Sequence, residues 1–135
     1  PSAVKADLYA RQLFVYQGRI SLEKNVEALL RGWRQADMGP NCKLAIVGSG
    51  PLEASLKRFY GDENDIIWLG YLANEQRRID ILRAADGFIL PSLVEGLSLS
   101  LLEAMACGTA CIATDAGADG EVLAEGAGIV LDTQR

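Results

Sequence analysis

The fold is decided by the stretch from residue 88 to residue 108, which reads Phe88-Ile-Leu-Pro-Ser-Leu-Val-Glu-Gly-Leu-Ser-Leu-Ser-Leu-Leu-Glu-Ala-Met-Ala-Cys-Gly108. Gly87–Leu90 is a short apolar run that predicts a buried strand, and Pro91 with Ser92 predicts a turn. The apolar residues that follow predict a helix that ends at Gly108. A helix that begins at the carboxyl end of a strand offers unpaired backbone N–H groups and the positive end of its dipole. We therefore expect a phosphate site there.

Two carboxylates, Glu95 and Glu103, flank the start of this helix with seven residues between them. No Lys or Arg lies within ten positions of Glu95, so its carboxylate needs another kind of partner. Carboxylates repel phosphate but accept hydrogen bonds from hydroxyl groups. A ligand that carries both phosphate and many hydroxyls is a nucleotide sugar, and the stretch predicts this class of ligand.

The composition of the 135 residues is that of one globular domain, because half of them are hydrophobic. The net charge of -5 argues against nucleic acid and against an anionic membrane as the main partner. No apolar run reaches the roughly 18 residues of a spanning helix, and no signal peptide opens the chain, so we expect a cytoplasmic protein. The first residue is Pro1 and not Met, which indicates a fragment of a longer chain.

Three scattered cysteines and the absence of histidine make a poor zinc set. We expect Cys42, Cys107 and Cys111 to be reduced thiols, as in a cytosolic protein. The commonest general base at neutral pH is also missing from these residues.

Apolar runs and turn signals alternate along the chain. The predicted strands cover residues 13–16, 43–47, 66–69, 87–90, 110–113 and 128–131. The other predicted helices run from Ser21 to about Met38, from Pro51 to about Tyr60 and from Asn74 to Ala85, with a helical turn over 121–125 after a glycine-rich loop. Strands that alternate with helices form an α/β fold with a doubly wound parallel sheet, Rossmann-like and here six-stranded.

Residues 1–12 are interpreted as a linker or fragment edge, and residues 13–135 as one ligand-binding domain that is truncated after its sixth strand. Ligands of doubly wound sheets bind outside the carboxyl ends of the strands. Arg19, the Gly48–Pro51 turn, Tyr71 and Glu95 all follow strand ends. We expect them to share one edge of the sheet.

Several of these features also have a purely structural alternative. Arg19 and Lys24 can be solvated charges, although a cation in the first turn of a helix opposes the dipole unless an anion binds in front of it. The Gly48–Pro51 turn fails the Gly-x-Gly-x-x-Gly pattern at position 53, which favours a tight turn into a helix. Ser100 and Glu103 have the spacing of a capping box, which would use the Glu103 carboxylate on a backbone N–H.

Four segments resemble a known family, and the resemblance runs from about Phe14 to Leu131. They are Gly18-Arg19 with Glu23-Lys24-Asn25, Val47-Gly48-Ser49-Gly50-Pro51, Trp68-Leu69-Gly70-Tyr71, and the run from Glu95 to Gly108 that ends in Glu-Ala-Met-Ala-Cys-Gly. These segments resemble the C-terminal, donor-binding half of GT-B glycosyltransferases, most closely the retaining group 1 family (family 4). The block with two glutamates is the most specific of the four.

The resemblance implies a role for each matching residue. Arg19 and Lys24 would hold the donor diphosphate and stabilise the charge on the departing nucleotide, so no metal and no other cofactor is expected. Glu95 would meet hydroxyls of the donor sugar, and Glu103 those of the ribose. Backbone groups would complete the site: the N–H groups of Gly96, Leu97, Ser98 and Leu99 at the sugar and phosphates, and the backbone around Tyr71 and Leu72 at the base. Many relatives have Gly and Pro where this chain has Ser98 and Ser100.

The resemblance also implies a missing N-terminal domain. In the family that domain binds the acceptor, closes the cleft and often supplies a His near the reacting carbon, and any membrane contact would run through it. We therefore expect the chain to bind a nucleotide-sugar donor weakly without transferring the sugar. The alternatives are a non-catalytic nucleotide-sensing or assembly module of the same fold, and a relative such as a sugar-nucleotide epimerase or a sugar phosphorylase.

Overall fold

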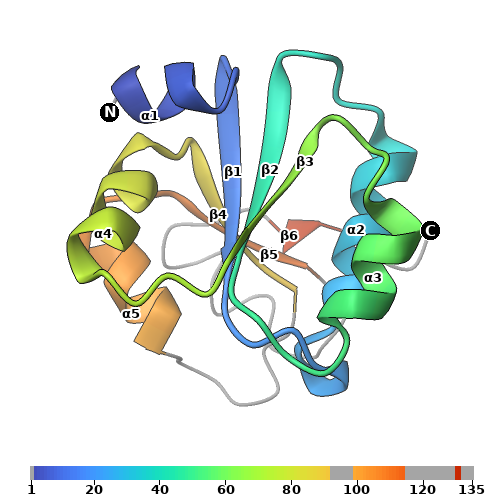
Figure 1. The fold of residues 1–135 in the computed structure, drawn as a ribbon. Helices are drawn as coiled ribbons and strands as arrows, with labels where there is room; N and C mark the ends of the chain where they lie inside the picture. The colour runs from blue at the N-terminus through green and yellow to red at the C-terminus, as the bar shows by residue number, and fades with distance from the viewer. Residues whose placement is uncertain (1, 92–98, 115–129, 132–135) are drawn as a thin grey trace.

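A computed structural model describes residues 2–91, 99–114 and 130–131 of the chain. Helices and strands alternate along them, as Figure 1 shows. In chain order they are α1 Ser2–Asp7, β1 Gln12–Gln17, the 3-10 turn η1 Leu22–Lys24, α2 Val26–Ala36, β2 Cys42–Val47, α3 Glu53–Tyr60, β3 Ile66–Gly70, α4 Glu75–Ala84, β4 Gly87–Leu90, α5 Leu99–Ala106, β5 Cys111–Thr114 and β6 Val130–Leu131.

The strands form one parallel sheet in the order β3-β2-β1-β4-β5-β6. The chain builds from β1 outward to β3 on one side and then places β4 on the other side of β1. Such a reversal of strand order is where open α/β sheets bind ligands. The predicted parallel, Rossmann-like α/β sheet is confirmed. The last strand, predicted over residues 128–131, is the two-residue β6 in the described part of the chain.

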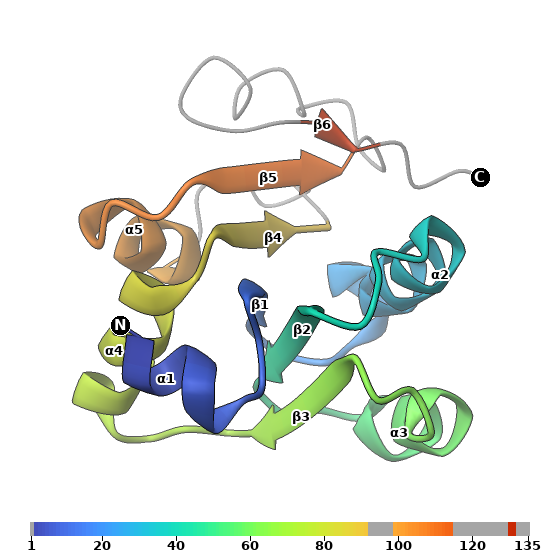
Figure 2. The ribbon, with the colours of Figure 1, turned by 90° about the horizontal axis from the view of Figure 1, so that it is seen from above.

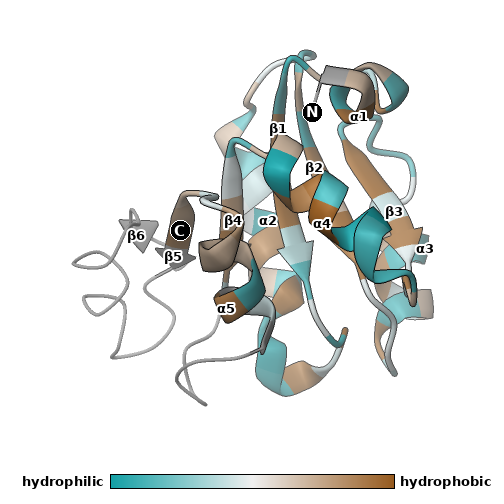
Figure 3. Ribbon diagram, turned by 90° about the vertical axis from the view of Figure 1, so that its left-hand side faces the viewer, coloured by the Kyte–Doolittle hydropathy of each residue, from teal (hydrophilic) through white to brown (hydrophobic). Residues whose placement is uncertain are grey.

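Helices cover both faces of the sheet, with α1, α4 and α5 on one face and α2 and α3 on the other (Figure 2). The two faces follow from the alternation of side chains along β1. Leu13 and Val15 pack with the first layer, whereas Phe14 and Tyr16 pack with the second. Because both faces are covered, the inner strands are largely apolar. Hydrophobic colour runs along β3 in Figure 3, whereas α4 is hydrophilic over much of its length.

The N-terminal segment, interpreted as a linker or fragment edge, contains a short packed helix. Residues 2–7 form α1, which packs against α4. Val4 and Leu8 are buried in the core, and Lys5 Nζ lies 2.9 Å from a carboxylate oxygen of Asp86. A six-residue helix has too few apolar residues to produce a periodic pattern, so it leaves little sign in the sequence.

The helix predicted from Ser21 to Met38 is two separate elements. Asn25, with φ 58° and ψ 34°, interrupts it between η1 and α2, and Asp37, with φ 49° and ψ 62°, ends α2. Asn and Asp adopt this left-handed conformation more readily than other residues with a Cβ. Lys24 therefore lies in η1 and not in the first turn of the long helix, which corrects its predicted position.

The start of α4 follows its prediction. Asn74 caps the helix, because its Oδ1 accepts a hydrogen bond from the backbone N–H of Arg77 at 2.9 Å. Leu82 is buried as predicted, whereas Ile79 is only half-buried and Ile81 takes its place in the core.

The cysteines are free thiols, as predicted. Cys42 and Cys111 are buried and Cys107 is half-buried. Burial raises the pKa of the Cys111 thiol, and burial together with the charges of Asp65 and Asp86 raises that of Cys42. No helix in the described ranges has the length and apolar character needed to cross a bilayer. The loop predicted after β5 and the helical turn over 121–125 lie outside those ranges.

Candidate functional site

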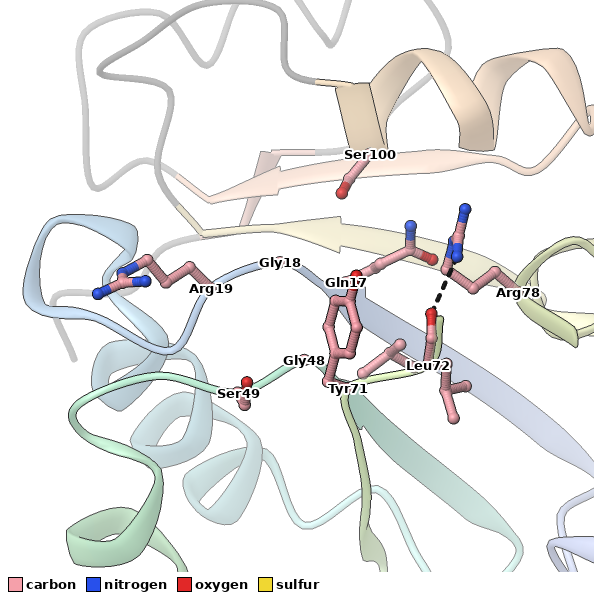
Figure 4. Close-up of a pocket in the computed structure, with 10 residues that line it drawn as sticks. Gln17, Gly18, Arg19, Gly48, Ser49, Tyr71, Leu72, Arg78 and Ser100 are labelled. Carbon is pink, nitrogen blue, oxygen red and sulfur yellow. Dashed lines mark hydrogen bonds between the residues drawn. The ribbon is translucent and has the colours of Figure 1, made fainter. Parts of the chain in front are cut away.

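A pocket of about 380 Å³ lies at the carboxyl edge of the sheet, where β1, β2 and β3 end (Figure 4). The side of α4 and the beginning of α5 complete its wall. The strand ends predicted to share one edge do so, apart from Glu95, which is outside the described residues. The lining residues are Gln17, Gly18, Arg19, Val47, Gly48, Ser49, Tyr71, Leu72, Arg78 and Ser100.

The floor of the pocket is backbone that extends the sheet beyond its strands. The N–H of Gly18 donates to the carbonyl of Val47 at 2.9 Å, and the N–H of Gly48 donates to that of Gly70 at 2.8 Å. Gly48 has a φ of +138°, and a Cβ there would lie 1.9 Å from the Gly18 carbonyl oxygen. Only glycine allows the two loops to meet this closely. The turn after β2 is thus a tight structural turn, as the pattern favoured, and it also borders the pocket.

Arg19 lies at one end of the pocket with an exposed side chain, and Arg78 lies at the other end (Figure 4). The hydroxyl of Tyr16 donates to the Arg19 carbonyl at 2.7 Å, which fixes the backbone that carries the guanidinium. Tyr16 is almost fully buried, and burial, with the nearby charge of Glu23, raises the pKa of its phenol well above the ordinary value. The backbone turn under Arg19 is therefore held by a side chain that stays protonated.

Lys24 is half-buried in η1 and is not among the residues that line this pocket. Glu23 lies beside it on the surface. A backbone hydrogen bond is the largest cause of the lowered pKa of the Glu23 carboxyl, and the charges of Arg19 and Lys24 lower it further. Arg19 and Lys24, the two cations predicted to bind the diphosphate, therefore both lie close enough to the Glu23 carboxyl to lower its pKa.

Glu103 lies just behind the pocket wall, half-buried in α5. Its Oε1 accepts hydrogen bonds from Gln17 Nε2 at 3.0 Å and from Arg78 Nε at 3.3 Å. The Arg78 contact is also an ion pair, with exposed side-chain fractions of 22% and 25%. Ser100 is the second residue of α5 and not the residue before the helix. The capping-box interpretation of Glu103 is therefore wrong, since its carboxylate joins α5 to β1 and α4.

Gln17 and Arg78 are the lining residues that the sequence analysis missed. Gln17 had a weak signal, because it is the polar residue that directly follows the apolar run of residues 13–16 in β1. Arg78 had none, because its partners come from residues 72, 73 and 103 and meet it only in the fold.

Of the other predicted site residues, Tyr71 and Leu72 line the pocket, and Tyr71 is 74% exposed. Leu99 is the first residue of α5, and Glu95, Gly96, Leu97 and Ser98 lie outside the described residues. Pro91, which precedes the undescribed residues, is held by the turn between η1 and α2, because Asn25 Nδ2 donates to the Pro91 carbonyl at 3.3 Å.

The geometry suits a ligand with an anionic part and a ring. Arg19 supplies positive charge, and the first backbone N–H groups of α5 have no partner within the helix. At the far end, Tyr71 offers an exposed aromatic face and Leu72 a fixed backbone. Pockets at strand ends of this kind bind nucleotides in many unrelated proteins.

Known sequences place the chain in one family. Residues 8–135 match the family model described as "Glycosyl transferases group 1". A GDP-mannose-dependent monoacylated alpha-(1-6)-phosphatidylinositol monomannoside mannosyltransferase of Corynebacterium glutamicum is 34% identical over 123 residues, 84% of this chain and 32% of that protein. A GDP-mannose-dependent alpha-(1-6)-phosphatidylinositol dimannoside mannosyltransferase of Mycobacterium tuberculosis is 29% identical over 90% of this chain and 32% of that protein. The chain spans about a third of the length of these relatives.

Solved structures share the fold. The C-terminal domain of a group 1 glycosyl transferase family protein (LpcC) from Francisella tularensis has a TM-score of 0.77 and 23% identity, over 97% of this chain and 72% of that one. Anabaena Alr3699/HepE, in complex with UDP and glucose, has a TM-score of 0.74 and 23% identity, over 98% and 39%. With the sequence match over nearly its whole length, the chain belongs to the group 1 glycosyltransferases.

Proposed function

We propose that this chain is the donor-binding half of a retaining, family 4 GT-B glycosyltransferase that moves a sugar from a nucleotide-diphosphate donor. The observation that carries the proposal is the pocket at the carboxyl edge of the sheet, where β1, β2 and β3 end, with Arg19 at one end and Arg78, the ion-pair partner of Glu103, at the other. In this proposal the acceptor domain, the acceptor and any membrane contact belong to the part of a longer cytoplasmic protein outside this chain.

In this proposal the diphosphate lies between Arg19 and the N-terminal turn of α5, with Lys24 adding charge from η1. Negative charge grows on the diphosphate as the bond from the sugar carbon to the phosphate oxygen breaks. Fixed cations and helix N–H groups stabilise that charge without reorganisation. Arg19 and Lys24 thereby take the place of a divalent metal, and no cofactor is needed.

The nucleoside occupies the other end. The base lies against Tyr71 and the backbone of Leu72, and the ribose hydroxyls donate to Glu103. The carboxylate of Glu95 meets hydroxyls of the donor sugar. The names of the mycobacterial and corynebacterial relatives specify GDP-mannose, whereas the Anabaena structure contains UDP. Both guanine and uracil nucleotides are thus reasonable first ligands, with ADP as the third.

Calorimetric titration of the purified chain with UDP, GDP and ADP tests the proposal. One of the three should bind, and Arg19→Gln should weaken it about tenfold or more, because a charge-assisted hydrogen bond to phosphate is lost. The matched control is Arg31→Gln, which removes the same charge from the exposed face of α2 and should leave affinity unchanged. Wild-type affinity in Arg19→Gln, or no binding of any of the three nucleotides, would contradict the proposal.

A sensing or assembly module of the same fold would also bind nucleotide. Transfer assays separate the two, because the full-length protein should transfer sugar from the matching nucleotide sugar and the isolated chain should not. A full-length protein that binds the nucleotide sugar but neither transfers nor hydrolyses it would favour the sensing module.

A further inference from the structure

Arg78 connects α4 with the loop before it and with α5, 25 positions further along the chain. Its Nε donates to Glu103 Oε1 at 3.3 Å, and its Nη1 donates to the carbonyls of Leu72 at 2.9 Å and Ala73 at 3.1 Å. Figure 4 shows the guanidinium at the pocket end nearest Leu72, with the bond to that carbonyl drawn. One planar group thus holds α5 and the loop after β3 in a fixed relation to α4.

The donors of this cluster converge on a single oxygen of Glu103. Gln17 and Arg78 both donate to Oε1. Within the described part of the chain, no hydrogen bond is assigned to Oε2. A carboxylate fixed through one oxygen keeps the lone pairs of the other for an additional donor, and ligand hydroxyls are such donors. Among the described residues, both contacts that position this carboxylate use Oε1.

An Arg78–Glu103 ion pair that only stabilised the fold would not have to lie at the pocket. Half-buried ion pairs contribute little net stability, because desolvation offsets much of the attraction. Arg78 lines the pocket itself, and its other acceptors are the carbonyls of Leu72 and Ala73, next to Tyr71. Arg78 and Leu72 lie at the end of the pocket opposite Arg19 in Figure 4.

We propose that Arg78 is a positioning residue for nucleoside recognition: it aims Glu103 Oε2 at a ribose hydroxyl and sets the Tyr71–Ala73 backbone against the base. This inference rests on the proposed function, since it assumes a nucleoside diphosphate in the pocket. Its consequence is selectivity for ribose over deoxyribose that depends on a residue outside the two-glutamate block. The phosphate end, held by Arg19 and α5, does not depend on Arg78.

The test compares the nucleoside diphosphate that binds best with its 2′-deoxy and 3′-deoxy analogues, and with the corresponding monophosphate, by calorimetry on the purified chain. In the wild type, at least one deoxy analogue should bind about tenfold more weakly, the effect of losing one hydrogen bond to a charged group. In Arg78→Gln that ratio should fall to about twofold, whereas the ratio of diphosphate to monophosphate affinity should stay at its wild-type value. Arg78→Lys should give an intermediate ratio, because one ammonium cannot span Glu103 and both carbonyls.

Arg77→Gln is the matched control, since it removes the same charge one position earlier on α4 and leaves the backbone N–H that donates to Asn74. It should retain the wild-type ratios. Full ribose discrimination in both Arg78 variants would overturn the inference while leaving the proposed function intact. Absence of discrimination in the wild type would also overturn it, and absence of any nucleotide binding would overturn both. If Arg78→Gln does not stay folded at the titration temperature, Arg78→Lys provides the test. A wild-type ratio of ribose to deoxyribose affinity in Arg78→Lys would refute the positioning role of the guanidinium.

Discussion

Gly48→Ala is expected to be the most damaging alanine substitution among the described glycines, because it combines a clash with backbone strain. A Cβ at this position would lie 1.9 Å from the Gly18 carbonyl oxygen and 2.9 Å from its carbon. The φ of +138° is also unfavourable for any residue with a Cβ. The loop cannot retreat freely, since the N–H of Gly48 is bonded to the Gly70 carbonyl at 2.8 Å.

The magnitude follows from these two contributions. Left-handed or similarly strained backbone costs roughly 1–3 kcal/mol for a residue that is not glycine. Relief of the clash requires a backbone shift that breaks one or two hydrogen bonds, at about 1 kcal/mol each. The sum is about 2–5 kcal/mol, a large part of the roughly 5–15 kcal/mol by which domains of this kind are typically stable.

Alanine substitutions at two other glycines allow the backbone strain to be measured without the clash, and then with neither. Gly39 has a φ of +94°, and a Cβ added there would have no atom within 4 Å, so Gly39→Ala should show the strain alone, about 1–2 kcal/mol. Gly32 lies inside α2 with open space around it, so Gly32→Ala should stabilise the protein by about 0.5–1 kcal/mol. Urea unfolding followed by tryptophan fluorescence measures all three. A Gly48→Ala variant no less stable than Gly39→Ala would refute the close loop packing.

Other substitutions test the core and its titrating groups. Asp86→Ala should cost about 1–2 kcal/mol in urea unfolding, because it leaves the Leu13 N–H, now 2.8 Å from Asp86 Oδ2, without its partner; no loss would contradict that contact. Leu44→Ala, at a fully buried position of β2 in the core layer that includes α2, should lower the free energy of unfolding by about 2–5 kcal/mol. A loss under about 1 kcal/mol would show that the site is not tightly packed. Burial raises the thiol pKa of Cys42 and Cys111, so the folded protein keeps protons that the unfolded chain releases above pH about 8.5. The contribution of these thiols to the free energy of unfolding should therefore be complete below that pH and fall as the pH rises. Cys111→Ala should make the fall of the melting temperature from about pH 8 to about pH 10 shallower, and an unchanged slope would contradict the burial argument.

Much of the fold follows from local patterns in the sequence. β2, β3, β4 and β5 lie within a residue of their predicted bounds, because short apolar runs between polar or glycine-rich turns have few alternatives. The exceptions have specific causes. The break at Asn25 depends on one residue in a left-handed conformation, which a periodic apolar pattern does not reveal.

The candidate site was predictable where it depends on strand order. Arg19, Tyr71 and Leu72 lie at one edge because parallel strands end together. Gln17 and Arg78 were not predictable in this way, since they meet Glu103 across 86 and 25 positions of sequence. The same long-range contacts explain why Glu103 was open to a capping-box interpretation, as sequence spacing reports only local partners.

The central claim is that the carboxyl edge of the sheet binds a nucleoside diphosphate. A titration of the isotopically labelled chain with UDP, GDP and ADP, followed by amide chemical shifts, tests it most directly. For one nucleotide, the account predicts saturable shifts at Gly18, Arg19, Gly48, Tyr71 and Leu72, and none at Cys42, which begins β2 at the opposite edge. Shifts centred on that opposite edge, or none with any of the three nucleotides, would contradict the account.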